Sequence, residues 1–139
     1  MTEKILVPMD GSPSSEKALL EALRIAKKLG GKITAVNITE PVDWTVASPD
    51  AIILEKQMQD YQKKVLSRAL ELARKQGARI STSALDGNVP DRIISFAKKG
   101  GFSLIAMGSR GLSDIDRFLL GSVSDRVVRH SHCSVLVVK

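Results

Sequence analysis

The chain has 139 residues, of which 43% are hydrophobic and 26% are charged. This length and composition fit one folded domain over residues 1–139 and exclude a disordered chain. A lone cysteine, Cys133, excludes an internal disulfide and a zinc site built from several cysteines. No apolar run approaches the ~20 residues that cross a bilayer, and the first residues lack the layout of a secretory signal, so we expect a cytoplasmic protein with no membrane attachment.

The charge of the chain is positive and unevenly distributed. Its formal net charge is +6, with ten basic and nine acidic residues in 1–70 but eleven basic and six acidic residues in 71–139. A basic carboxyl-terminal half suits an anionic partner such as a phosphate or a nucleic acid, and a solvated basic surface explains the same charge. One Trp, one Tyr and three Phe offer little for stacking single-stranded bases, so nucleic acid is the less favoured partner.

The first predicted elements are a strand and a helix. Residues 5–7 form a short apolar run of the kind found in strands that are covered on both faces. The helix that follows has Ser12 as its cap, Pro13 in its first turn and a glycine pair at 30–31 as its end. Its expected inward stripe consists of Ala18, Leu19, Ala22, Leu23, Ala26 and Leu29.

A second strand and a long helix come next. Residues 33–38 predict the strand, and residues 40–50 have the composition of a connecting loop. The helix is expected to begin near Ser48 and Pro49 and to end near Gly77. Its apolar side chains recur at helical spacing along one stripe, which consists of Leu54, Met58, Tyr61, Val65, Ala69 and Leu72.

The second half of the chain continues the alternation of strands and helices. Strands are predicted at 80–85, 104–107 and 135–138, and helices at 89–99 and 119–130. The run at 80–85 is more polar than the others, which indicates an edge strand. The order βαβαβαβαβ predicts an α/β fold in which an open, five-stranded parallel sheet carries helices on both faces, joined by right-handed crossovers.

Glycines and polar residues gather where the first four predicted strands end. They occupy residues 8–12, 37–39, 86–88 and 108–111. Ligands of open α/β sheets bind outside the carboxyl ends of the strands, so this edge is a candidate ligand cleft. The same residue types also make turns and helix caps, and composition alone leaves both interpretations open.

The segment after the fourth strand adds a phosphate-binding pattern. Gly108 and Gly111 follow the strand, and Gly121 and Ser122 come nine residues later, at the start of the last predicted helix. Glycines let backbone amides approach a ligand, and a helix amino terminus suits phosphate. Turn formation and capping account for the same residues. The chain contains neither GxxxxGK[ST] nor a GxGxxG after the first strand, which excludes a Walker-type loop and a dinucleotide fingerprint.

On these residues the chain resembles the universal stress protein family, of the adenine nucleotide alpha hydrolase-like fold, over nearly its whole length. The matching segments read KILVPMDGSPSSEKAL, GNVPDRII, MGSRGLSDIDRFLLGSVSDRVV and RHSHCSVLVVK. The family's nucleotide-binding pattern is matched by the spacing of Gly108, Gly111, Gly121 and Ser122, and also by the early aspartate Asp10. The resemblance implies a Rossmann-like three-layer sandwich with strand order 3-2-1-4-5 and ATP bound between the loops after the first and fourth strands.

The resemblance also assigns residues to the nucleotide. The adenine and ribose side would be lined by Pro8, Met9, Asp10 and Ile38. The nucleotide would be bordered by Met107 and Gly108. The ribose and phosphates would be surrounded by Arg110, Gly111, Gly121, Ser122, Val123 and Ser124. Mg²⁺ or Mn²⁺ would be held mainly by phosphate oxygens and water, with no metal ligands from the protein. The sequence shows no general base, arginine finger, nucleophile elbow or catalytic triad. We therefore expect at most a weak ATPase.

The resemblance further implies a homodimer formed through the last strand, Val135 to Val138. Pairing of two copies would cover an apolar edge strand. Ser134 stands where the family commonly has proline, which adds an N–H group beside that edge. Two alternatives remain to a nucleotide-dependent stress-response module: a stress protein that acts through protein partners without nucleotide, and a basic nucleic-acid-binding protein.

Overall fold

The computed structural model describes residues 3–41, 48–110 and 120–139. Strands and helices alternate along these residues, as the sequence predicts. In chain order the elements are β1 (Lys4–Pro8), α1 (Pro13–Leu29), β2 (Lys32–Thr39), α2 (Pro49–Lys75), β3 (Ser81–Asp86), α3 (Val89–Lys99), β4 (Leu104–Gly108), α4 (Ser122–His130) and β5 (Ser134–Val138).

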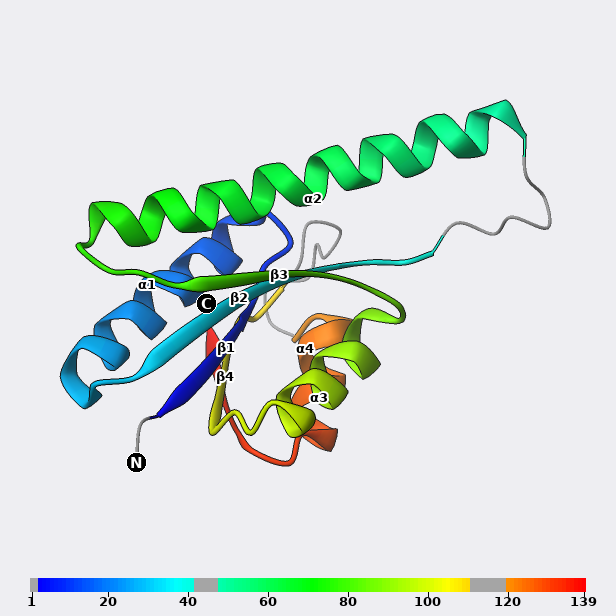
Figure 1. Ribbon diagram of the computed structural model, residues 1–139. Helices are drawn as coiled ribbons and strands as arrows, with labels where there is room; N and C mark the ends of the chain where they lie inside the picture. Colours follow the sequence, from blue (N-terminus) through cyan, green and yellow to red (C-terminus); the bar gives the residue numbers. More distant parts are fainter. Residues whose placement is uncertain (1–2, 42–47, 111–119) are drawn as a thin grey trace.

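The five strands form one parallel sheet with the order β3-β2-β1-β4-β5 (Figure 1). This order confirms the topology that the family resemblance implies and the edge position of β3. The strand order reverses beside β1, where the chain passes to β2 on one side and β4 lies on the other. In sheets of this kind a ligand site forms at that reversal, outside the carboxyl ends of the strands.

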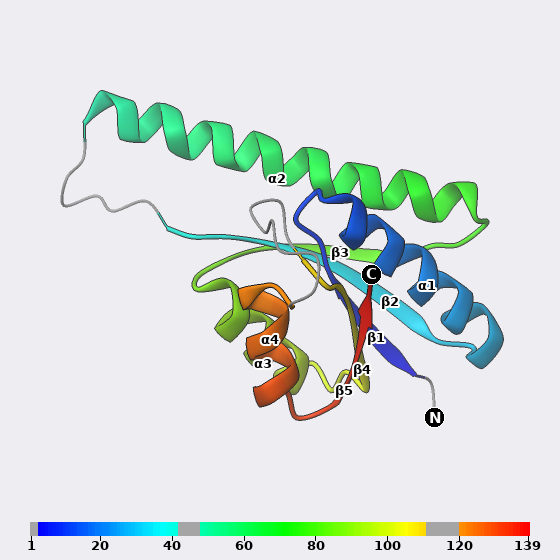
Figure 2. The ribbon, with the colours of Figure 1, turned by 180° about the vertical axis from the view of Figure 1, so that it is seen from behind.

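Helices cover both faces of the sheet, so the fold has three layers (Figures 1 and 2). Side chains alternate between the faces along each strand. Ile5 and Val7 of β1 belong to a core that includes buried residues of α1 and α2. Leu6, between them, belongs to a second core with Ile93 of α3 and Val127 of α4. The prediction of helices on both faces is therefore confirmed.

Local sequence signals place the ends of α1 as expected. Ser12 has extended backbone, and its Oγ accepts a hydrogen bond from the Ser15 N–H over 3.2 Å, which satisfies an amide that the helix leaves unpaired. Pro13 lies in the first turn. Gly30 ends the helix in the left-handed region with φ 72°, a conformation that glycine adopts without steric cost.

Two predicted inward stripes are partly wrong. Leu29 at the end of α1 is 62% exposed, and Leu54 near the start of α2 is 50% exposed, whereas Val65 and Ala69 further along α2 are buried. For Leu54, Figure 1 shows the reason: the amino-terminal part of α2 extends past the end of the sheet. Helical periodicity identifies one face of a helix but does not reveal where the sheet beneath that face ends.

The start of the last helix also differs from the prediction. The helix begins at Ser122, and Gly121 is its cap residue with extended backbone at φ −62° and ψ 159°. Leu120 precedes the helix and is not helical, and position 119 lies outside the described residues. The apolar pair before Gly121 favours a longer helix on periodicity alone, but Gly121 and Ser122 are the better helix-start signal.

Candidate functional site

A cavity of about 600 Å³ opens at the carboxyl ends of β1, β2 and β4. Helices α2, α3 and α4 supply the remaining walls. The residues of the sequence prediction that line it are Pro8, Met9, Asp10, Ile38, Gly108, Arg110, Ser122, Val123 and Ser124. The fold therefore brings together residues that are more than a hundred positions apart in the chain.

Two predicted site residues do not line this cavity, and a third lies outside the described residues. Met107 is 4% exposed and packs in the core beneath α3 and α4. Gly121 is buried behind the wall at the cap of α4. The third, Gly111, lies outside the described residues.

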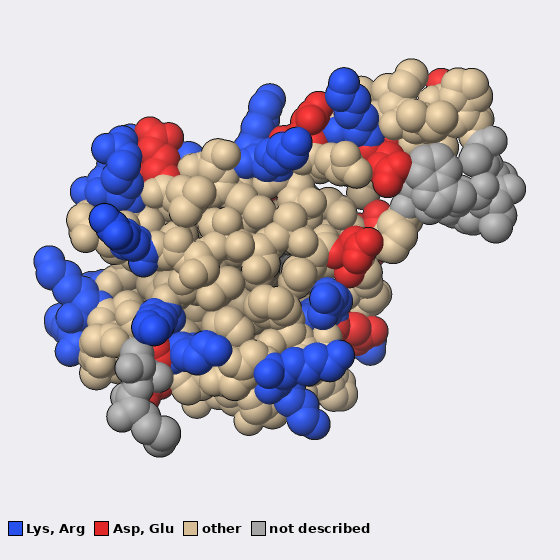
Figure 3. Space-filling view, in the orientation of Figure 1, with Lys and Arg blue, Asp and Glu red and all other residues tan. Residues whose placement is uncertain are grey.

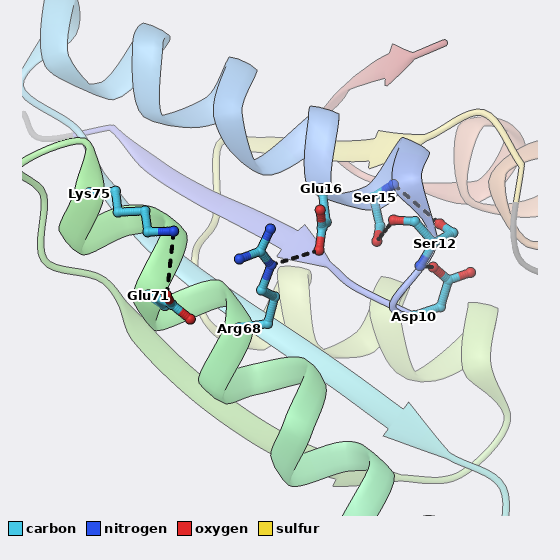
Figure 4. Close-up of polar contacts among 7 residues, drawn as sticks. All are labelled: Asp10, Ser12, Ser15, Glu16, Arg68, Glu71 and Lys75. Carbon is cyan, nitrogen blue, oxygen red and sulfur yellow. Dashed lines mark hydrogen bonds and ion pairs between the residues drawn. The ribbon is translucent and has the colours of Figure 1, made fainter.

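The turn between β1 and α1 forms one side of the cavity and is held by its own polar groups (Figure 4). The Asp10 carboxylate accepts a hydrogen bond from the Ser12 N–H over 2.9 Å. Ser15 Oγ donates in turn to the Ser12 carbonyl over 2.8 Å. Gly11 adopts φ 87°, which only glycine reaches easily. The turn is thus fixed before any ligand binds, with the Asp10 side chain at the cavity.

Helix α2 closes another side of the cavity with Gln57, Met58 and Tyr61. The Tyr61 hydroxyl donates to the carbonyl oxygen of Asp10 over 2.5 Å. Partial burial, and secondarily the negative charge of Asp10, raises the pKa of Tyr61 above its usual value. One ion pair, between Arg68 Nε and Glu16 at 3.1 Å, joins α2 to α1 farther from the cavity (Figure 4).

Two buried amides tie the carboxyl ends of the first three strands together. Asn37 Nδ2 donates to the Met9 carbonyl over 2.7 Å, which joins β2 to the residue after β1. Gln62 Nε2, from α2, donates to the Asn37 carbonyl over 2.8 Å and to the Leu85 carbonyl over 3.0 Å. Because buried polar groups are costly unless paired, these bonds fix α2 at one height above the sheet.

The amino end of α4 faces the cavity with Ser122, Val123 and Ser124. The first amides of a helix have no acceptor within it, and they carry the positive end of the helix dipole. The hydroxyl of Ser124 is already used, since it donates to the Ser109 carbonyl over 2.8 Å. The N–H of Gly121 donates to the same carbonyl over 2.7 Å. These two bonds anchor α4 to the end of β4 and leave backbone amides and the Ser122 hydroxyl as its donors toward a ligand.

Gly108 has a packing role that the sequence pattern did not predict. A side chain here would collide with the Ser14 hydroxyl, and its Cβ would lie 2.9 Å from the Ser14 carbonyl carbon. Ser14 Oγ also donates to the Arg110 carbonyl over 2.6 Å. Glycine at 108 thus lets the first turn of α1 lie against the end of β4, and this contact sets the distance between the two loops that border the cavity.

The predicted cleft included Asn37 and Thr39 within residues 37–39, and both line the cavity. Nothing in the sequence indicated that Tyr61, Glu40 or Val89 would do so. Asn37 is a polar residue within an apolar strand run, and that break in the pattern was the available signal. Tyr61 was placed on the inward stripe of α2, and the structure puts it at the margin of that stripe with 43% exposure. Thr39 ends β2, Glu40 follows it, and Val89 begins α3; all three belong to the cavity wall.

The charges near the cavity are mixed. Asp10, Glu40 and Arg110 line it. On the face drawn in Figure 3, Lys and Arg side chains lie around a broad uncharged centre and alternate with Asp and Glu. In the described parts of the chain no group of three His, Cys, Asp or Glu side chains is arranged to hold a metal ion. Within the same residues, no helix is long and apolar enough to span a bilayer.

A five-stranded parallel sheet of this order, with a cavity between the β1–α1 turn and the amino end of α4, defines a Rossmann-like α/β protein. The chain matches the model of the Universal stress protein family over residues 1–139. It belongs to the universal stress protein family.

Individual relatives agree with this assignment. The chain is 33% identical over 139 residues to a universal stress protein of Methanocaldococcus jannaschii, a match that covers 99% of this chain and 82% of the relative. It is 32% identical over 148 residues to the universal stress protein YxiE of Bacillus subtilis, with both chains covered completely.

Solved structures show the same fold. The universal stress protein UspA from Lactobacillus plantarum superposes with a TM-score of 0.82 at 24% identity, over 99% of this chain and 97% of that one. A universal stress protein in complex with cAMP gives 0.75 at 28% identity, over 99% and 97% of the two chains. The Archaeoglobus fulgidus protein in complex with dAMP gives 0.71 at 24% identity, over 100% and 98%.

Proposed function

We propose that this chain binds an adenine nucleotide, ATP with Mg²⁺ or Mn²⁺, in the cavity at the carboxyl ends of β1, β2 and β4. The observation that carries the proposal is the composition of that one cavity. It combines apolar side chains such as Met9 and Ile38 with the amino end of α4. An apolar wall suits a purine base, and helix amides suit phosphate oxygens. The cAMP complex of a relative at 28% identity supports an adenine nucleotide as the ligand class.

The remaining groups fit a nucleotide in the same way. Asp10 and Glu40 offer carboxylate oxygens, and hydroxyls of a ribose are donors that such oxygens accept. Arg110 contributes positive charge at the cavity wall. The metal ion would be held by phosphate oxygens and water, as Mg²⁺ commonly is at nucleotides. The family pattern also assigns Gly111 and Gly121 to the phosphate side, and we propose that Gly121 acts there as the cap that positions the first amides of α4, since its own N–H is bonded to the Ser109 carbonyl.

We further propose that the nucleotide is a regulatory ligand in a stress response and is hydrolysed slowly or not at all. Efficient phosphoryl transfer needs a residue that orients the nucleophile and positive charge on the transferred group. We assign the two lining carboxylates, Asp10 and Glu40, to the ribose hydroxyls and assign no residue of the cavity wall as a general base. We expect turnover of ATP by the purified protein below about 1 per second.

Calorimetric titration with ATP, ADP, AMP and cAMP, with and without Mg²⁺, tests the site when it is repeated on two variants of Ser122. Ser122→Asp places a negative charge in the first turn of α4, where it favours the helix but repels phosphate. Ser122→Asn is its neutral, equally sized control. We expect the aspartate variant to lose ATP binding while its melting temperature is kept, and the asparagine variant to bind. Equal affinity of both variants for ATP would contradict the placement of the phosphates at α4.

A further inference from the structure

Tyr61 connects a helix to the turn that forms one side of the cavity. It is the only tyrosine of the chain, and it lies in α2, twelve residues into that helix. Its side chain lines the cavity, and its hydroxyl donates to the Asp10 carbonyl over 2.5 Å. Tyr61 is separated from Asp10 by 51 positions in sequence, so this contact exists only because α2 lies over the end of β1.

The turn is built to receive that hydroxyl. Gly11, the next residue, has φ 87°, and a Cβ atom there would collide with the Tyr61 hydroxyl. The other side of the turn is fixed by the bond from the Ser12 N–H to the Asp10 carboxylate. Asp10 is therefore held at its carbonyl by α2 and at its side chain by the start of α1.

The phenol is a reliable donor in this place. A tyrosine hydroxyl keeps its proton at neutral pH, and burial and the nearby Asp10 charge raise the pKa of Tyr61 further. Beside it, Gln62 bonds the carbonyls of Asn37 and Leu85. Two consecutive residues of α2 thus hold the carboxyl ends of β1, β2 and β3, and Tyr61 is the one of the pair that lines the cavity.

We infer that Tyr61 is a positioning residue of the site: its hydroxyl holds the Asp10–Gly11 turn in the conformation that binds the ligand, and it thereby couples nucleotide affinity to the placement of α2. This inference rests on the proposed nucleotide function. Coupling between a ligand and a structural element is reciprocal, so a bound nucleotide must also restrain α2 around Tyr61. Tyr61→Phe keeps the ring and removes only the hydroxyl, so it isolates the contribution of that hydrogen bond to the coupling.

The test compares Tyr61→Phe with Ser67→Ala, which removes a hydroxyl from an exposed position on the same helix outside the cavity wall. ATP affinity is measured by calorimetry, and hydrogen exchange is followed with and without saturating ATP. We expect Tyr61→Phe to bind ATP roughly three- to tenfold more weakly, the loss typical of one hydrogen bond. Residues 57–62 should gain protection with ATP in the wild type, gain much less in Tyr61→Phe, and behave as wild type in Ser67→Ala.

The outcomes separate this inference from the function on which it rests. If the wild type binds no adenine nucleotide, the proposed function fails and the inference fails with it. If the wild type binds ATP and Tyr61→Phe binds within about twofold of it, the inference alone is overturned. If Tyr61→Phe does not fold, hydrogen exchange of the wild type still tests the inference. Exchange of residues 57–62 that saturating ATP leaves unchanged would show that the nucleotide does not restrain α2, and would overturn the inference.

Discussion

The Ser14 hydroxyl donates a hydrogen bond to the Arg110 carbonyl over 2.6 Å and joins the first turn of α1 to the segment after β4. The two residues lie 96 positions apart. Both loops border the cavity, so their separation determines its width. The contact is possible only because Gly108 has no side chain between them.

Replacing Gly108 with alanine is expected to destabilise the protein by about 1–3 kcal/mol, because the added methyl group meets Ser14 in a close-packed region. Removing the Ser14 hydroxyl as well should not restore stability, since the Ser14 backbone carbon is also too close, at 2.9 Å. Gly31→Ala is the milder comparison, because a methyl group there meets the Glu3 carbonyl oxygen at 3.2 Å, a tight contact but one that is longer than the contacts at Gly108. Urea unfolding of the three variants measures the differences, and a Gly108→Ala protein as stable as wild type would contradict the packing role.

Gln62 provides a second test of how the cavity edge is held. Gln62→Leu keeps the approximate size of the side chain but removes the donor that serves the carbonyls of Asn37 and Leu85. One hydrogen bond contributes about 0.5–1.5 kcal/mol, so we expect the loss of two to lower the free energy of unfolding by about 1–3 kcal/mol. Gln59→Leu makes the same change at an exposed position of α2 and should alter stability little. Equal effects of the two substitutions in denaturant titrations would show that the buried bonds contribute nothing.

The elements of the fold show which features can be predicted from the sequence. Apolar runs predicted all five strands, because strands covered on both faces leave a signal that is local. The helix caps at Ser12 and Gly30 could also be predicted, since capping depends on residues that are close together in sequence. The family resemblance then supplied the strand order, which alternation of elements alone leaves open.

Contacts between segments that are distant in the chain could not be predicted from the sequence. Gly108 fits a ligand-binding pattern, and nothing in its neighbours reveals that Ser14 packs against it. Gln62 is a polar residue beside an apolar stripe, which by periodicity alone belongs on the surface, yet it is 9% exposed. Its burial follows from two carbonyl groups on other strands, and their positions depend on the complete fold.

The ionisation of Tyr61 leads to a pH-dependent stability. Its pKa is raised above the ordinary tyrosine value of 10.0 by burial and by Asp10. The folded state therefore keeps the phenol proton at pH values where the unfolded chain has begun to lose it. The contribution of this group to stability is complete below pH 10 and falls as the pH rises through the folded pKa.

Absorbance at 295 nm measures this ionisation, since the chain has one tyrosine. We expect the folded protein to titrate at a higher pH than the same protein in urea. Tyr61→Phe should lack the part of the alkaline loss of stability that comes from this group. Coincident titration curves for folded and unfolded protein would show that the Tyr61 hydroxyl is solvated as in a free peptide.

The last strand supports a specific prediction about assembly. β5 lies at the edge of the sheet beside β4. The Ser109 N–H donates to the Val138 carbonyl over 2.8 Å, so the Val138 peptide groups face β4. Backbone groups alternate in direction along a strand, and the Val137 N–H therefore points to the open edge. We propose that two copies pair through Val135 to Val138 about a twofold axis, which satisfies these groups in both copies.

Val137→Pro tests this pairing without disturbing the sheet, because proline is tolerated on an edge strand where its missing N–H would face outward. We expect light scattering to show a dimer for the wild type and a monomer for Val137→Pro, with similar melting temperatures. Leu136→Pro removes an N–H that faces β4 and should instead lower the melting temperature by several degrees. A dimer that survives Val137→Pro would exclude β5 as the interface and direct attention to the exposed Ile52 and Ile53 of α2.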